Sequence, residues 1–392
     1  MALANGSGNG ALGGNGGLGA LGGNGTLGSI GGIQTGNLNA GGSARSSLPL
    51  QGGHAPLRMS RRSFLATTGL LAGGALLGLV GCGAGTAAGS SAGTGGPAVS
   101  KVTIGHLTST AQTVVGERKG FFSEEFAKDN VEVEFVQFPS GPLVIEAMKA
   151  GDVTFGTSAA QPVLTSNANG TNLKFFCSYK TTEKGNALVV SDASGIKTLS
   201  DLKGKRLGYT VGTTLHNLTL KVLAEAGLSE GDVELMNMQV GDIVTSLKSG
   251  DLDGGFIWEP MITTLTAAGG FSVLRDGTGL LLEYCGMVAG NDFLQQNASL
   301  AVRFVNAMET SRKWIGENVD EAVSIIAEVS GNSDAGVRAL LEKSDISTGI
   351  NDADLKGIDD TAGFLKDNDM IPDAIPAEKV VDLDILKQAG VA

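Results

Sequence analysis

The sequence predicts an α/β protein whose sheets are mainly parallel, and three observations support this fold class. From Lys101 onward, short apolar runs rich in β-branched residues alternate with amphipathic helical patterns. After Asp292 the pattern is purely helical. Residues 1–100 differ from the rest, because they hold 30 of the 61 glycines and no acidic residue, and such a segment cannot build a packed core. We therefore expect the folded part to begin near Lys101.

Ten segments are predicted to be strands, because each is a short apolar run bounded by turn-forming residues. In chain order they are 102–106, 131–138, 153–156, 173–178, 187–191, 206–209, 233–236, 254–258, 271–274 and 282–289. Two helices between them are defined by periodicity. In 141–150, one apolar face consists of Leu143, Ile145 and Met148. In 213–226, the apolar stripe consists of Leu215, Leu218, Val222 and Leu223.

The charge and cysteine content exclude several classes of function. Residues 101–392 carry all 40 acidic residues and 24 of the 28 basic ones, so no basic face for phosphate binding is visible and nucleic acid is not an expected partner. Three cysteines and three histidines, with no Cys-x-x-Cys pair, leave little material for a metal centre. We expect neither a metal nor a cofactor.

Residues 59–82 have the organisation of an export signal. The pair Arg61-Arg62, with Phe64 two positions further on, resembles the twin-arginine signal, and an uncharged apolar run follows. A membrane helix is the alternative, but the run at 64–80 contains four glycines and is short for a span. The pattern therefore favours a secretory signal.

The last four residues of this signal, Leu-Val-Gly-Cys at 79–82, resemble the bacterial lipobox. In a lipobox the cysteine becomes the lipid-modified first residue of the mature chain, so Cys82 is the predicted lipidation site. Residues 83–98 are then a flexible tether rich in Gly, Ala and Ser. We expect a protein anchored by lipid on the outer face of the bacterial cytoplasmic membrane.

Residues 1–58 precede this signal, where an export signal normally has nothing. They contain two similar nonapeptides, at 15–23 and 24–32, which invite comparison with calcium-binding repeats. Leucine stands in both copies where those repeats need an aspartate ligand, so a calcium site is excluded. Met59 directly precedes the paired arginines, and translation is predicted to start there. The upstream part is then a misplaced start or a disordered Gly- and Asn-rich leader.

Six short motifs in a fixed order identify a family resemblance. They are ERKGFF at 117–122, AMKAGDVTF at 147–155, LSDLKGKR at 199–206, GTTLH at 212–216, GDLDG at 250–254 and IWEP at 257–260. A seventh, DTAGFLK at 360–366, extends the likeness toward the C-terminus. With these motifs, residues 101–279 resemble the extracytoplasmic solute-binding proteins of ABC importers, in the alkanesulfonate, taurine and nitrate group.

That resemblance implies a two-lobe periplasmic-binding-protein-like fold of type II, with two hinge crossings and a ligand cleft between the lobes. We expect lobe one to comprise 101–190 and 283–392, and lobe two 191–282. The resemblance also implies a monomeric protein, not an enzyme, that delivers a small organic anion, a sulfonate or taurine, to ABC permease subunits. Nitrate, bicarbonate or a pyrimidine precursor of thiamine are alternative ligands. An enzyme of the same fold that makes such a precursor is the alternative function.

The residues disfavour that enzyme. The enzyme family carries a cysteine-rich motif, whereas Cys177 stands alone. Residues 101–392 contain no Gly-x-Ser-x-Gly sequence, and His106 and His216 are their only histidines, so serine-hydrolase chemistry is also unsupported. Cys177 and Cys285 could form a disulfide in an exported protein or be buried as small apolar residues, and the sequence leaves both open.

Loops after the carboxyl ends of strands face the cleft in such a fold, and helix N-termini there present N–H groups to an anion. Four loops supply small or polar candidates for ligand contacts: Ser109, Thr110 and Gln112; Thr157, Ser158 and Gln161; Gly212, Thr213 and Thr214; Ser140 and Gly141. A single hydroxyl at such a position is more often a helix cap, so the prediction depends on the convergence of several loops. We expect the N–H groups of Thr213 and Thr214, with nearby hydroxyls, to hold one oxyanion.

Five further residues are candidates for the same cleft. His216 and Asn217 lie one turn into the predicted helix, where a lone histidine is usually structural. Trp258 and Glu259 end a predicted strand, and their alternative roles are hinge packing and a charge at a helix N-terminus. Glu259 or Asp242 is the expected counter-charge for an amino group such as that of taurine.

Overall fold

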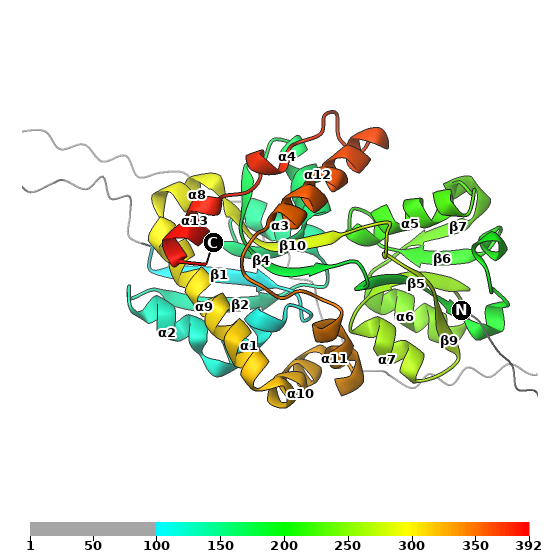
Figure 1. Cartoon of the computed structure of the whole chain (residues 1–392), viewed down its shortest axis with the longest axis horizontal. Helices are drawn as coiled ribbons and strands as arrows, with labels where there is room; N and C mark the ends of the chain where they lie inside the picture. Colours follow the sequence, from blue (N-terminus) through cyan, green and yellow to red (C-terminus); the bar gives the residue numbers. More distant parts are fainter. Residues whose placement is uncertain (1–98, 392) are drawn as a thin grey trace, which may run out of the picture. The chain divides into compact units, whose positions relative to one another are not determined.

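The computed structural model describes residues 99–391, which form two mixed β-sheets with helices packed against them (Figure 1). The predicted leader, the signal at 59–82, the lipidation site Cys82 and the tether at 83–98 lie outside the described residues. Within 99–391, every helix is too short or too polar to cross a membrane.

The two sheets have the same pattern of strands. The first has the order β2-β1-β3-β10-β4. The second has the order β7-β6-β8-β5-β9. The strands of the first sheet are β1 (Lys101–His106), β2 (Glu132–Gln137), β3 (Phe155–Ala159), β4 (Leu173–Thr182) and β10 (Glu283–Gly290). Those of the second are β5 (Asn186–Ser191), β6 (Arg206–Tyr209), β7 (Glu234–Asn237), β8 (Gly254–Trp258) and β9 (Phe271–Asp276).

Each predicted strand overlaps one of these ten, so the α/β class is confirmed. The expectation of mainly parallel sheets is also confirmed, because four of the five strands of each sheet run in the same direction and only β10 and β5 are reversed. β1 is parallel to β2 and β3, and β6 is parallel to β7 and β8, but β10 and β5 are antiparallel to both of their neighbours. The reason is that β10 returns to the first sheet from the second, and β5 enters the second sheet from the first.

The chain passes between the sheets twice. The first crossing lies between Thr182 and Asn186, because β5 pairs within the second sheet, whereas the lobe boundary was predicted at residue 190. The second crossing lies between Asp276 and Glu283. There Gly277 approaches the other crossing closely, since a Cβ at this position would lie 2.4 Å from the Glu183 carbonyl oxygen. The two crossings therefore run side by side.

Helices cover both sheets. Those associated with the first sheet are α1 (Ala111–Lys119), α2 (Phe121–Ala127), α3 (Gly141–Ala150), α4 (Ala160–Ala168), α8 (Asn291–Gln296), α9 (Ala298–Glu317), α12 (Asp352–Asp367) and α13 (Leu383–Ala389). Those on the second sheet are α5 (Thr214–Glu225), α6 (Val240–Ser249) and α7 (Met261–Ala267). α10 (Val319–Ser330) packs on α1, and α11 (Asp334–Glu342) packs on both α10 and α7. Short 3₁₀ turns occupy Asp192–Ser194, Leu199–Leu202, Glu230–Asp232 and Ala377–Lys379.

Each sheet has its own hydrophobic core. An aromatic cluster anchors the first, where the ring centroids of Phe155 and Phe304 lie 4.8 Å apart and Phe176 contacts both rings. The core of the second sheet includes the predicted stripe of α5, all buried: Leu215, Leu218, Val222 and Leu223. The prediction for α5 is thus confirmed.

The apolar face of α3 differs in part from the prediction. Val144 is fully buried, whereas Leu143 is 41% exposed. The helix lies over Gly156 of β3, where an added Cβ would meet Val144 and Met148 at 2.6 and 2.7 Å. This close approach of helix and strand selects Val144 as the inward residue.

Candidate functional site

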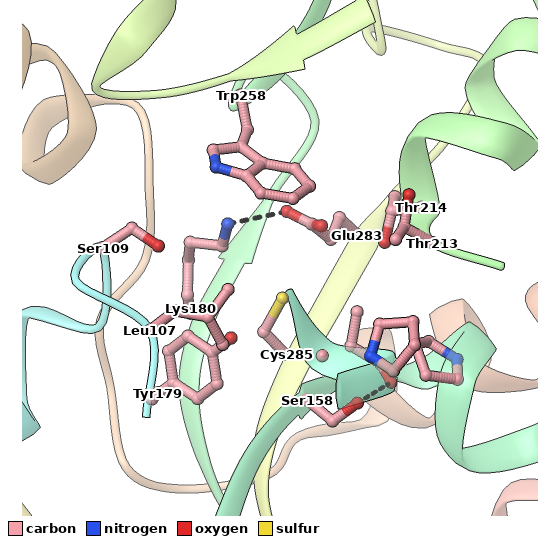
Figure 2. A pocket seen from close by; sticks show the side chains of 14 residues that line it. Leu107, Ser109, Ser158, Tyr179, Lys180, Thr213, Thr214, Trp258, Glu283 and Cys285 are labelled. Atoms are coloured by element: carbon pink, nitrogen blue, oxygen red, sulfur yellow. Dashed lines mark hydrogen bonds and ion pairs between the residues drawn. The ribbon is translucent and has the colours of Figure 1, made fainter. Parts of the chain in front are cut away.

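A cavity lies between the two sheets and is lined from both (Figure 2). It contains about 430 Å³ of empty space, a volume that includes its mouth and the solvent there. The second-sheet side supplies Thr213, Thr214 and Trp258. The other lining residues belong to the first-sheet side and are Leu107, Ser109, Gly141, Pro142, Ser158, Ala159, Pro162, Tyr179, Lys180, Glu283 and Cys285. We call this space the first cavity.

A buried ion pair forms part of the wall of the first cavity. Lys180 on β4 and Glu283 on β10 place Nζ and Oε2 2.8 Å apart, with side chains only 10% and 5% exposed. Burial alone would lower the pKa of Lys180, but the carboxylate of Glu283 raises it above its ordinary value. Burial would raise the pKa of Glu283, but the charge of Lys180 holds it below its ordinary value. Both groups are therefore charged at neutral pH, and the ring of Trp258 lies beside them (Figure 2).

The N-terminus of α5 meets the same cavity. Thr213 is the N-cap: its Oγ1 accepts a hydrogen bond from the Leu215 N–H (3.2 Å), and its hydroxyl donates to the Thr210 carbonyl (2.7 Å). That hydroxyl is thus occupied by capping. The first N–H groups of a helix have no acceptor within it, and the helix dipole adds partial positive charge. The first turn of α5 therefore offers an anion backbone donors beside the Thr214 side chain.

A second, smaller cavity adjoins the first, and Thr214 and Glu283 line both. It contains about 190 Å³ of empty space, a volume that includes its opening to solvent. Its other lining residues are Ala160, Gln161, Asn217, Leu281, Tyr284 and Thr361.

The structure brings half of the predicted ligand contacts to these cavities. The first cavity is lined by six of them: Ser109, Gly141, Ser158, Thr213, Thr214 and Trp258. The second is lined by Gln161 and Asn217, with Thr214 shared. Their role as ligand contacts stays a prediction, but their convergence from separate loops is now a geometric fact.

Gln112, Thr110 and Ser140 line neither cavity. Gln112 is fully buried, and its Nε2 donates to the carbonyls of Tyr179 (2.9 Å) and Ile346 (2.8 Å), so it holds two distant segments together. Thr110 and Ser140 are buried residues that precede α1 and α3. Thr110 and Ser140 each lie between a strand and a helix, and this is why the sequence predicted them to face the cleft.

Thr157, Gly212 and His216 also lie outside both cavities. Thr157 is buried inside β3, because the strand continues to Ala159 instead of ending at residue 156. Gly212 has a φ of 77°, and its N–H donates to Nδ1 of His216 at 3.4 Å. Burial lowers the pKa of His216, so the ring is neutral at pH 7 and helps to shape the loop before α5.

Neither predicted counter-charge is available to a ligand in these cavities. Asp242 is exposed in the first turn of α6. Glu259 is buried, but its Oε1 pairs with Lys343 Nζ at 2.5 Å and accepts from the Thr263 hydroxyl at 2.8 Å. Its Oε2 accepts from the Thr263 N–H at 3.1 Å. Glu259 thus links α7 to the segment after α11.

The charged pair that does line the cavity was missed by sequence reasoning. Lys180 lies two residues beyond the predicted strand 173–178, and Glu283 is the second residue of the predicted strand 282–289; a charge at such a position is ordinarily expected to be exposed. Cys285 also lines the first cavity, and both it and Cys177 are free and buried. In residues 99–391, no group of three or more His, Cys, Asp or Glu side chains is placed to hold a metal ion.

Comparison with known proteins gives consistent matches. The family model described as NMT1/THI5 like matches residues 108–322, more than half of the chain. A candidate aliphatic sulfonates-binding protein of Bacillus subtilis (strain 168) is 27% identical over 313 residues, which is 79% of this chain and 93% of that protein. The taurine-binding periplasmic protein of Escherichia coli (strain K12) is 27% identical over 296 residues, 69% of this chain and 88% of that protein.

A solved structure has the same fold. The alkanesulfonate-binding protein SsuA from Xanthomonas axonopodis pv. citri, bound to MOPS, superposes with a TM-score of 0.67 over 74% of this chain and all of that chain, at 23% identity. The predicted two-lobe periplasmic-binding-protein fold is therefore confirmed.

Proposed function

We propose that this chain, which belongs to the NMT1/THI5-like family, is an exported solute-binding protein that delivers a small organic sulfonate to an ABC import permease. The observation that carries the proposal is the first cavity, where Lys180, the first turn of α5 and hydroxyl groups from both sheets face one small space. The relatives named for sulfonates and taurine support the same ligand class.

A sulfonate suits these groups for physical reasons. Its single charge is spread over three oxygens, so several donors can each form a hydrogen bond to one oxygen, and no bidentate arginine is needed. Ser109 and Ser158 offer hydroxyls from the first-sheet side, and Thr214 offers one from the second. An anion held by both sides would favour closure of the lobes on it, as expected of a monomeric binding protein.

Binding is favoured over catalysis by the protonation state of Cys285, the one thiol among the residues that line the first cavity. Burial raises the pKa of the Cys285 thiol to about 12, so it is protonated at neutral pH. Neither His106 nor His216 lines a cavity, so no histidine is placed to activate it. The cavity can hold and orient a solute, and it has no thiolate to attack one.

Ligand-dependent stability tests the ligand class. We expect alkanesulfonates or taurine to raise the free energy of unfolding of the full-length protein by about 2.7 kcal/mol when present at 100 times their dissociation constant, because they bind the folded state alone. Thermal denaturation with taurine, ethanesulfonate, nitrate, bicarbonate and a hydroxymethylpyrimidine measures this. A shift with nitrate or the pyrimidine and none with the sulfonates would refute the proposed class.

The proposed lipid anchor is tested separately. Cys82 follows the export signal in the lipobox arrangement, so its thioether-linked lipid would hold the protein at the membrane. We expect Cys82→Ala to move the protein from the membrane fraction to the soluble extract of the cell envelope, with sulfonate binding unchanged. Retention of this variant in the membrane fraction after carbonate washing would show that Cys82 is not the anchor.

A further inference from the structure

A third segment joins the two lobes besides the two crossings of the chain. It comprises residues 331–345, which are α11 and the residues on either side of it, and we call it the strap. It begins after α10, which packs on α1 of the first-sheet lobe, and α11 then packs on α7 of the second-sheet lobe (Figure 1). It ends at Asp345, which exchanges backbone hydrogen bonds of 2.8 Å with Thr181 of β4. The strap therefore starts and ends on the first-sheet lobe and lies against the second-sheet lobe in between.

The strap and α7 are in close contact. Gly336 in the first turn of α11 lies so near α7 that an added Cβ would be 2.3 Å from Thr264 Oγ1 and 2.5 Å from the Pro260 carbonyl oxygen. The hydroxyls of Thr264 and Ser333 lie 3.0 Å apart, and the Ser333 N–H donates to Thr264 Oγ1 at 3.2 Å. A side chain larger than that of glycine at position 336 would hold α11 away from α7.

An ion pair fixes the far end of the strap to the same place. Lys343 Nζ lies 2.5 Å from Glu259 Oε1, and the Glu259 side chain is fully buried. The Lys343 carbonyl accepts a hydrogen bond from the Thr182 hydroxyl at 2.6 Å, so Lys343 is also attached to the first-sheet lobe. Separation of the lobes here would pull Lys343 away from Glu259, and a buried carboxylate that loses its cation is costly. The pair therefore favours the arrangement in which both sheets line the first cavity.

The strap is attached next to the wall of the first cavity. Glu259 directly follows Trp258, which lines that cavity. Burial lowers the pKa of Lys180, but the carboxylates of Glu283 and, to a smaller degree, Glu259 raise it. The contact between the strap and the second-sheet lobe is thus made by the neighbour of a cavity residue.

We propose that the strap holds the two lobes together and favours their closed arrangement before a ligand binds. Gly336 and Lys343 are then positioning residues, which act on the ligand only through the distance between the lobes. This inference rests on the proposed function, because it concerns a protein whose lobes close on a solute. Loosening the strap lowers the fraction of molecules that are ready to bind, and the apparent affinity falls by the same factor.

Two substitutions loosen the strap by different means. Lys343→Met removes the cation of the ion pair, and Gly336→Ala adds a methyl group for which there is no room between α11 and α7. Alanine is otherwise the better helix residue, so an effect of Gly336→Ala reports the contact with α7 and not the helix itself. We expect each variant to lengthen the distance between the lobes in the ligand-free protein and to weaken taurine binding about fivefold or more.

Spin labels on the two sides of the cleft measure the distance between the lobes. The two sides are close at one point, since a Cβ added at Gly212 would lie 4.0 Å from Pro142 Cγ. Glu146 on α3 and Val211 before α5 are exposed positions near this point, and each is replaced by Cys and labelled. The full-length protein carries Cys82→Ala, because its other cysteines are buried. Electron paramagnetic resonance gives the distance, and calorimetry with taurine gives the affinity.

Each substitution has a matched control. Arg338→Met removes a cation of α11 that pairs with Asp320 on α10, so it leaves the contact with α7 intact. Gly316→Ala adds a methyl group to α9 in open space. Both controls should keep the wild-type distance and affinity. The two test variants disturb the strap independently, so either one tests it if the other fails to fold.

The distance in the ligand-free protein decides the outcome. An unchanged distance in Lys343→Met and Gly336→Ala would overturn the inference even if taurine bound more weakly, because the loss would then lie in the cavity and not in the arrangement of the lobes. The proposed function fails separately. If neither taurine nor ethanesulfonate binds the wild type while both variants lengthen the distance, the sulfonate class is wrong and the role of the strap stands.

Discussion

Replacing Lys180 by Met is expected to lower the free energy of unfolding by about 3–5 kcal/mol and to weaken sulfonate binding by at least about tenfold. Lys180 is the partner of the Glu283 carboxylate, and both side chains are almost fully buried. Removing one member of such a pair leaves the other charge in the interior without compensation. The same substitution removes the cation that would face the sulfonate. Urea denaturation and calorimetry measure the two effects.

The pH dependence of the stability lost in Lys180→Met identifies the cause of that loss. Without Lys180, burial is the main influence on Glu283 and raises its pKa above the unfolded-state value. A group with a raised folded-state pKa contributes stability below its unfolded-state pKa and loses it as the pH rises through its folded-state pKa. The stability deficit of Lys180→Met relative to wild type should therefore shrink as the pH falls from 7 toward the ordinary pKa of a glutamate. A deficit independent of pH would contradict the ion-pair explanation.

Two further variants separate charge from side-chain loss. Lys184→Met removes a nearby exposed lysine, so neither stability nor binding should change. The double variant Lys180→Met with Glu283→Gln removes both charges and should recover most of the stability, because no uncompensated charge remains. It should not recover binding. If the double variant is as unstable as the single one, packing of the lysine stem, and not charge, is what stabilises the site.

Most of the architecture could be predicted because local pattern determines it. The stripe of α5 is read from spacing alone, and all four of its apolar residues are buried as expected. Strand direction is different, because a short apolar run looks the same whether its neighbours are parallel or antiparallel. β5 and β10 could not be recognised as antiparallel from sequence, since their direction follows from the crossings between the sheets.

The site was predicted less completely, and the misses share a cause. A small polar residue such as Thr157 looks like part of a loop, yet it belongs to β3 and lies buried within that strand. Lys180 and Glu283 look like solvated strand ends, yet they come together only because β4 and β10, far apart in sequence, are neighbours in one sheet. A pairing that depends on tertiary contact leaves no local signal.

The loop before α5 shows the opposite case. The sequence Gly-Thr-Thr at 212–214 predicted a turn and a helix start near a ligand, and the structure has a left-handed glycine, a capping threonine and a second threonine at the cavity. Local chemistry was enough here because a helix cap is formed by adjacent residues. The cap also distinguishes the two threonines. The hydroxyl of Thr213 is used in capping α5, whereas that of Thr214 takes no part in the cap.

Replacing Thr214 by Val is expected to weaken sulfonate binding by about 1.5–3 kcal/mol, roughly tenfold or more, while the protein stays folded. Valine keeps the shape of the side chain but has no hydroxyl to donate to the anion. The backbone N–H of residue 214 and the dipole of α5 remain in the variant, so binding should be weakened and not abolished. Calorimetry with the best-binding sulfonate measures the loss, and the thermal midpoint without ligand checks the fold.

Thr219→Val is the matched control on the same helix. Thr219 is buried, lines neither cavity and donates its hydroxyl to the Leu215 carbonyl at 2.7 Å, so its loss should leave the affinity unchanged. Ser158→Ala should behave like Thr214→Val, because Ser158 lines the first cavity from the opposite sheet. Wild-type affinity in both Thr214→Val and Ser158→Ala would place the anion outside the first cavity. A loss of affinity in only one of the two variants would show that the anion is held from one sheet and not from both. Closure of the lobes would then need another cause.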